Sequence, residues 1–141
     1  MPGIKKSIFE YNAWANNEIF SLLTTIDSSI FPEVVHSAIR VLNHAFVVDE
    51  IFRSHLLQRS NDHTATNTDA TPAVLWLFEK VKELDAWYIL YASTVEDKAL
   101  SESIEFTFTD GDRGKMTREE ILLHVITHGG YHRGQVGQII R

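Results

Sequence analysis

The chain of 141 residues contains no cysteine and no long apolar run. The absence of cysteine excludes disulfide bonds, thiolate nucleophiles and thiolate metal ligands, and it is typical of a reducing compartment. No apolar run approaches the roughly 18 residues that a membrane span needs. The start of the chain, MPGIKKSIFE, has no apolar core of a signal peptide. We therefore expect a cytoplasmic protein without a membrane partner.

Basic residues are also few. The chain has 13 lysines and arginines against 19 acidic residues, which gives a net charge of −6. Nucleic acids are bound mainly through basic surfaces, so we expect no nucleic-acid partner. Apolar residues make up 44% of the chain and charged residues 23%, which is ordinary for a globular protein. We interpret residues 1–141 as one domain.

Apolar residues recur with a period near 3.6, which predicts an all-α fold. Proline is tolerated in the first turn of a helix, so Pro2, Pro32 and Pro72 fit helix starts. Thr71 is the expected cap of the third helix, and a capping box begins the last one at Thr117. The four predicted helices cover Ile4–Thr25, Pro32–Gln58, Pro72–Thr94 and Arg118 to nearly the C-terminus. Helices of this length in one domain predict a four-helix bundle.

The first predicted helix carries an apolar stripe that we expect to face the core. The stripe consists of Ile4, Ile8, Tyr11, Ala15, Ile19, Leu22 and Leu23. Its spacing is that of an amphipathic helix with one buried face.

Two segments interrupt the helical pattern. Residues 61–70 are polar and rich in threonine, and we interpret them as a surface loop. Residues 103–116 alternate Ile104, Phe106 and Phe108 before a turn, which predicts a short β-hairpin or an extended excursion before the last helix. Both segments could frame a cavity.

Seven histidines stand out in a chain that lacks cysteine. His124, His128 and His132 follow one another at intervals of four in the last predicted helix, so they share one face of it. That face also carries apolar residues and points into the core. Buried imidazoles without partners would cost about 1–3 kcal/mol each, whereas a divalent metal ion binds neutral imidazole directly. The pattern favours a metal site over histidines that only pack.

The second predicted helix supplies the ligand that such a site needs from a facing helix. His44 lies in its apolar face near mid-helix, at a depth similar to that of His128 and His132. His36 lies off this face, and His55 lies about 16 Å farther along the helix, too far to share an ion with His44. We predict that His44, His128 and His132 bind one divalent ion per chain.

His124 is the alternative ligand on the last helix. It lies farther from the centre of the apolar face, so we expect it to line the pocket. The spacing of His128 and His132 is that of an HExxH zinc protease, but the glutamate that acts there as general base is absent. A zinc-protease function is therefore disfavoured.

Catalytic side chains are less clearly marked. Tyr131 and Gln135 lie on the rim of the histidine face and are candidates to orient a substrate or a water molecule; simple packing is the alternative. Asp49 and Glu10 are possible general bases, although no spacing selects either of them.

Glycines form a strip on the last helix opposite the histidines. Gly130, Gly134 and Gly137 lie there together with apolar residues. Each glycine destabilises a helix interior by up to about 1 kcal/mol relative to alanine, so glycines at these positions indicate a packing or functional role. The strip fits a close crossing with another helix of the same chain, or a contact between two copies. We predict a homodimer through this strip.

Three segments resemble the DinB-like (DinB/YfiT) family: HVITHGGYHRGQVGQIIR at the C-terminus, YNAWANNEIF near the start and LNHAFVVDEIF in the second predicted helix. Their order and spacing match, so the resemblance covers essentially the whole chain. It implies a four-helix bundle with up-down-down-up connectivity, often dimeric. It also implies a metal site at His44, His128 and His132 that nickel or zinc usually occupies.

The resemblance implies several activities. Some relatives are metal-dependent transferases or isomerases that use low-molecular-weight thiols, and the family name records induction by DNA damage. We hypothesise a metal-dependent enzyme of the thiol S-transferase or hydrolase type, with a small-molecule thiol and an electrophile as substrates and a link to stress. The alternative is a stress-linked metal-binding protein without turnover. An accessible pocket at the metal would favour the enzyme.

Overall fold

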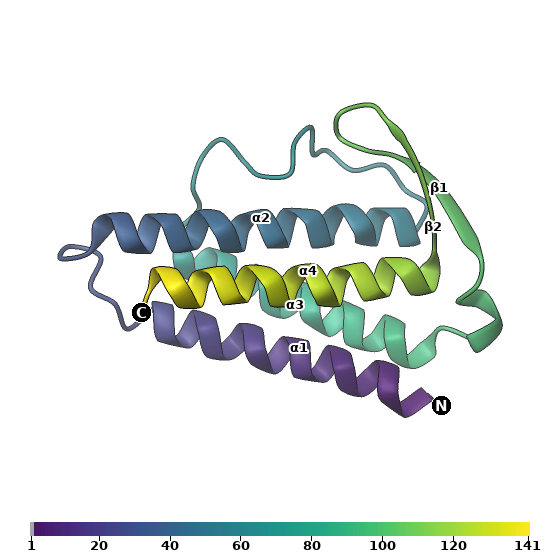
Figure 1. Ribbon diagram of the computed structural model, residues 1–141, viewed down its shortest axis with the longest axis horizontal. Helices are drawn as coiled ribbons and strands as arrows, with labels where there is room; N and C mark the ends of the chain where they lie inside the picture. The colour runs from purple at the N-terminus through teal and green to yellow at the C-terminus, as the bar shows by residue number, and fades with distance from the viewer. Residues whose placement is uncertain (1) are drawn as a thin grey trace.

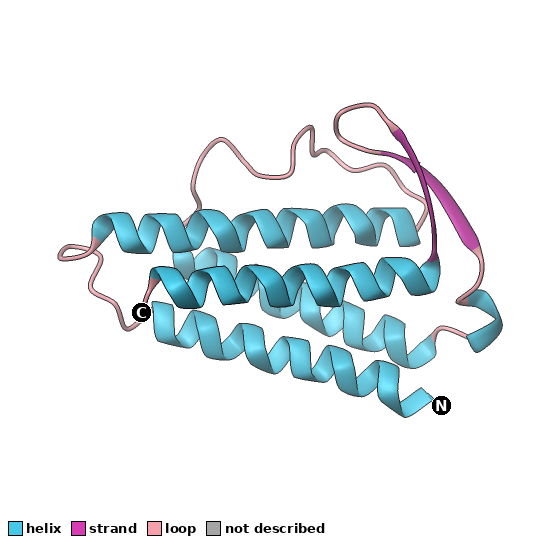
Figure 2. Cartoon of the chain, in the orientation of Figure 1, coloured by secondary structure: helices cyan, strands magenta, loops and turns pink. Residues whose placement is uncertain are grey.

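The computed structural model describes residues 2–141, which form four long helices and one β-hairpin (Figures 1 and 2). The elements are α1 (Pro2–Leu23), α2 (Pro32–Leu56), α3 (Val74–Thr94), a short 3-10 helix (Asp97–Ala99), β1 (Ser103–Thr107), β2 (Arg113–Thr117) and α4 (Arg118–Ile139). The predicted helical fold with an excursion before the last helix is confirmed. In the described part of the chain, no helix has the length and apolar character of a membrane span.

The four helices lie side by side (Figure 1). Helices α1 and α4 run in one direction and α2 and α3 in the other, with α1 packed mainly on α3 and α2 mainly on α4. All four contribute to one core, whose most deeply buried large side chains are Phe20, Leu23, Val47, Leu77, Tyr88, Ile121, Val125 and Val136. Because α2 and α4 are antiparallel neighbours, the middle of one faces the middle of the other.

Three of the predicted helix starts are confirmed and one is wrong. Pro2 begins α1, Pro32 begins α2, and Thr117 exchanges hydrogen bonds with Glu120 in a complete capping box at the start of α4. Thr71 does not cap α3, which begins at Val74 after Ala73. Ala73 is still extended, and the loop before it is tied to α2 by side-chain hydrogen bonds.

The predicted core stripe of α1 is wrong in four of its seven members. Ile4, Ile8, Tyr11 and Leu22 are 65%, 39%, 63% and 53% exposed, whereas Leu23 is buried as predicted and Ile19 packs against the core. The buried face of α1 consists of Phe9, Asn12, Phe20 and Leu23. This face includes asparagines that bind polar groups of other helices, so its sequence pattern is less apolar than that of the exposed face.

The excursion before α4 is an antiparallel hairpin. Its register pairs Ser103 with Thr117 and Thr107 with Arg113. Gly111 adopts a φ of +94° in the turn, a conformation that glycine accepts without strain. Gly114 lies under the Phe108 ring, where a Cβ atom would be only 2.6 Å from the nearest ring carbon. The hairpin leads directly into the capped start of α4.

Candidate metal centre

The three predicted ligands converge where α2 and α4 face each other. The imidazole ring of His44 lies 5.1 Å from that of His128 and 4.7 Å from that of His132, measured between centroids. One ring nitrogen from each residue lies within 4.8 Å of the others. The Nε2 atoms of His128 and His132 are 3.0 Å apart, close to the about 3 Å between two nitrogens bound to one zinc or nickel ion. The three histidines can therefore hold a metal ion.

Hydrogen bonds set the tautomers of two of the ligands. The Nδ1 of His44 donates to the backbone oxygen of Thr66 at 2.7 Å, and the Nδ1 of His132 donates to the Oε1 of Gln135 at 2.5 Å. Both acceptors are carbonyl oxygens, so the proton resides on Nδ1 and the lone pair on Nε2. This is the usual arrangement of metal-binding histidines, because a bond to the other nitrogen fixes the ring and raises its basicity.

The loop between α2 and α3 holds the acceptor for His44 in place. The buried Asn43 donates its amide to Asn67 Oδ1 at 2.6 Å and to Thr68 Oγ1 at 2.7 Å. These bonds clamp the loop on α2 one residue before His44, so that the oxygen of Thr66 faces the imidazole. The loop was predicted only as a surface segment that could frame a cavity, and the structure adds this orienting role.

Burial favours the neutral form of two of the imidazoles. Burial, together with the neighbouring His132, His124 and His44, lowers the pKa of His128 to about 4. Burial also lowers the pKa of His132, although the bond to Gln135 acts in the opposite direction. Neutral imidazole is the form that binds a metal ion, so the shifts at His128 and His132 favour metal binding near neutral pH. The Nδ1 of His128 is buried without a hydrogen-bond partner.

The other candidate residues surround this centre. His124 stacks on His128 with 5.2 Å between ring centroids and lies outside the group of three converging ligands. Tyr131 is 66% exposed, and its ring meets that of His132 at 5.1 Å. Gln135 orients His132, a role that the sequence did not reveal.

The remaining histidines of the described chain lie apart from the triad. His36 is exposed on α2. His55 is buried and stacks on Phe106 of the hairpin at 4.2 Å, and His63 meets Glu50 at 2.9 Å between Nε2 and Oε1. None of them is among the residues that converge on the metal position.

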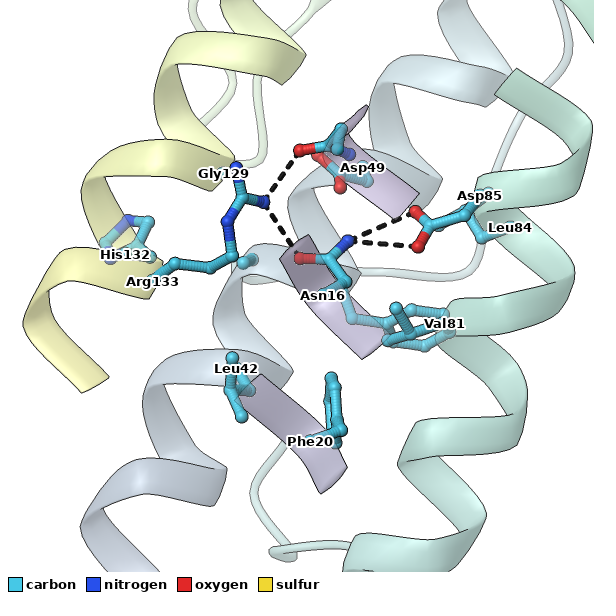
Figure 3. A pocket seen from close by; sticks show the side chains of 13 residues that line it. Asn16, Phe20, Leu42, Asp49, Val81, Leu84, Asp85, Gly129, His132 and Arg133 are labelled. Atoms are coloured by element: carbon cyan, nitrogen blue, oxygen red, sulfur yellow. Dashed lines mark hydrogen bonds between the residues drawn. The ribbon is translucent and has the colours of Figure 1, made fainter. Parts of the chain in front are cut away.

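A buried polar network adjoins the triad (Figure 3). The guanidinium of Arg133 points from α4 between the helices and donates to the side-chain oxygens of Asn12 and Asn16 at 2.7 and 2.9 Å. Asn16 in turn donates to both carboxylate oxygens of Asp85 at 3.0 and 3.2 Å. Gly129 makes room for the bond between Arg133 and Asn12, since a Cβ atom at this position would lie 3.3 Å from both Arg133 Nη1 and Asn12 Oδ1. No sequence pattern predicts the network, because its members come from helices that lie far apart in the chain.

The two candidate bases differ in their surroundings. Glu10 is exposed on α1, whereas Asp49 is buried, and burial raises the pKa of Asp49 well above its ordinary value. Burial also raises the pKa of Asp85 to about 6, although Asn16 and Arg133 oppose this shift. The structure thus places Asp49, and not Glu10, in the interior near the histidines.

Comparison with known proteins gives one consistent result. The model of the DinB family matches residues 1–141. The chain is similar to the Protein DinB of Bacillus subtilis (strain 168), with 27% identity over 144 residues that cover 95% of this chain and 83% of the relative. No solved structure matches the chain significantly.

The bond between Gln135 and His132 generates a first prediction. Gln135→Ala should weaken metal binding by about 10- to 100-fold, because His132 loses the acceptor that fixes its ring. Gln138→Ala, an exposed change on the same helix, is the matched control and should bind normally. Zinc titration of both variants checks this. Equal affinity of the two variants would show that Gln135 does not support the site.

The pKa of Asp85 generates a second prediction. The carboxyl of Asp85 has a pKa of about 6 in the folded protein and 3.8 in the unfolded chain, so the folded protein holds the proton more tightly. The stability that this proton contributes is therefore full below about pH 4 and is lost as pH rises through about 6. Asp85→Asn has no proton to lose. Its free energy of unfolding relative to wild type should therefore rise by on the order of 3 kcal/mol between pH 4 and pH 7.5. Urea unfolding of metal-free protein measures this, and parallel pH curves would contradict it.

Proposed function

Because the chain belongs to the DinB family over residues 1–141, we propose that it binds one divalent metal ion through His44, His128 and His132. The observation that carries the proposal is the convergence of three imidazoles, two of them with Nδ1 bonded to a carbonyl oxygen so that Nε2 keeps its lone pair. Nickel and zinc are the ions that we propose, since imidazole suits both.

We further propose a metal-dependent enzyme of the thiol S-transferase or hydrolase type. A divalent ion with three neutral imidazole ligands keeps coordination positions open and lowers the pKa of a thiol or water that it binds. The chain has no cysteine, so a thiol nucleophile must come from a small-molecule cosubstrate. Gln135 holds the ring of His132 in place, and the exposed hydroxyl end of Tyr131 is available to contact a substrate at the rim.

A second candidate function is a metal-binding protein without turnover, linked to stress. The size of the internal cavity that adjoins His132 favours it, because that cavity has about 20 Å³ of room, which suits one water molecule and not a substrate. Under the first proposal the substrate approaches from the open side of the triad, where Tyr131 is exposed.

We propose that the helices form an up-down-down-up bundle that pairs into a homodimer. Gly134 and Gly137 have no other atom within 4 Å of an added Cβ, so no helix of the same chain crosses there. Toward the start of α4, about 16 Å from Gly134, the surface is apolar, with Leu123 55% and Ile4 65% exposed beside a groove between α1 and α4. A second copy would cover this surface.

Removal of a ligand tests the metal site. His132→Ala should abolish stoichiometric metal, whereas His124→Ala should retain most of it because His124 lies outside the converging group. His36→Ala, a change on the surface of α2, is the control for metal that is lost during purification, and it should keep its metal. Elemental analysis of protein purified from each variant gives the result. A full equivalent of metal in His132→Ala protein would overturn the ligand assignment.

A transferase screen separates the two functions. Zinc- or nickel-loaded wild type should consume a small-molecule thiol in the presence of electrophiles, and the His132→Ala protein should show only the uncatalysed rate. Loss of free thiol is followed spectroscopically. A wild type that binds one metal ion and never exceeds the uncatalysed rate with any thiol and electrophile pair would favour the protein without turnover.

The glycine strip yields a prediction on assembly. Gly134→Leu should fold normally, because the site is open within one chain, but it should sediment as a monomer, because a long side chain separates the two copies. Glu83→Leu adds the same side chain to the exposed face of α3 and should remain a dimer. Sedimentation of an unchanged dimer in Gly134→Leu would place the interface elsewhere.

A further inference from the structure

The polar network at the centre of the helical core contains more acids than bases. Asp49 of α2 and Asp85 of α3 supply two carboxyl groups, whereas Arg133 of α4 supplies the guanidinium. Helix α1 adds only uncharged amides to it. Tyr88 of α3 donates its hydroxyl to the backbone oxygen of Asp49 at 2.6 Å and so carries no charge there. One of the two acids is therefore without a counter-charge.

Hydrogen bonds show which acid that is. Both carboxylate oxygens of Asp85 accept from Asn16, and Arg133 lies in the same network. Both neighbours stabilise the ionised form of Asp85. Asp49 is only 9% exposed, and its Oδ1 has no hydrogen-bond partner. A buried carboxylate without donors is costly, so Asp49 is the acid that keeps its proton.

An internal cavity links Asp49 with the triad. Asp49, Arg133 and His132 line the same cavity of about 20 Å³, which has room for one water molecule (Figure 3). His132 therefore belongs both to the cavity wall and to the group of ligands. Besides His132, the charged or titratable side chains around Asp49 are Asp85 and Tyr88 from α3 and Arg133 from α4.

The ligands themselves supply no negative charge. Three neutral imidazoles leave the double positive charge of a bound ion uncompensated in a partly buried site, where charges interact more strongly than in water. An acid nearby that can ionise offsets part of this charge. Resting on the metal binding proposed above, we propose that Asp49 is the buried counter-charge of the metal centre: it is protonated in the metal-free protein and releases its proton to solvent when a divalent ion occupies the three histidines.

Calorimetric titration with zinc at pH 7.5 tests this. The same titration in buffers of different ionisation enthalpy counts the protons released per ion bound. Asp49→Asn should release about one proton fewer than wild type and bind zinc about 10-fold or more weakly, because the amide cannot ionise. Glu50→Gln changes the next acid in the chain, which meets His63 instead, and is the matched control with the wild-type count.

The outcomes separate this inference from the metal site itself. Equal proton release by wild type and Asp49→Asn, both binding one zinc ion, would overturn the inference and leave the metal site standing. A wild type that binds no zinc would overturn both. Asp49→Asn should also leave the melting temperature of the metal-free protein nearly unchanged, because a neutral group replaces a neutral group.

Infrared spectroscopy of the wild type gives an answer even if Asp49→Asn does not fold. At pH 7.5 Asp85 is ionised, because its pKa is about 6. Metal-free protein at this pH should therefore show the C=O stretch of one protonated carboxylic acid, that of Asp49. One equivalent of zinc should remove this band and add carboxylate absorption. A band that is absent from the start, or that persists after zinc is bound, would contradict the inference.

Discussion

The antiparallel contact between α2 and α4 brings the three imidazoles together, and the candidate site depends on it. His44 lies near the middle of α2, so it meets the pair His128 and His132 near the middle of α4. The contact also partly buries the rings, and this burial, with the neighbouring histidines, lowers the pKa of His128 to about 4. Position and protonation state thus have one cause, which is how closely these two helices pack. The oxygens of Thr66 and Gln135 then turn the Nε2 lone pairs of His44 and His132 inward.

The second constraint is polar, and it lies on the other side of His132. An arginine, two aspartates and two asparagines from all four helices line one internal cavity, where an apolar core would have been simpler to build. Natural sequences depart from simple core packing mainly where function requires it. The proposed divalent ion, held by neutral ligands, would be such a requirement, and a buried acid on the same cavity would supply the missing charge. This connects Asp49 with the triad in one electrostatic unit.

Local patterns made much of this predictable. The helices, the hairpin and the capping box at Thr117 follow from periods and turn residues that lie within a few positions of one another. The histidines share a helix face through their spacing of four, and only the match of depth with His44 required a tertiary argument. The prediction of the buried face of α1 was wrong because the polar Asn12 belongs to that face, where it binds Arg133, 121 positions away in the chain. The acceptor on Thr66 is a backbone atom of a loop, which no side-chain pattern reveals.

X-ray absorption at the metal edge of zinc- or nickel-loaded wild type tests the central claim most directly. The fine structure reports the ligand atoms, their number and their distances without any assumption about activity. Three imidazole nitrogens at about 2.0–2.1 Å, with the outer-shell scattering of their rings and water-type oxygens completing the shell, are the expected result. A shell made of oxygens alone, or one with a single imidazole, would contradict a site built from His44, His128 and His132.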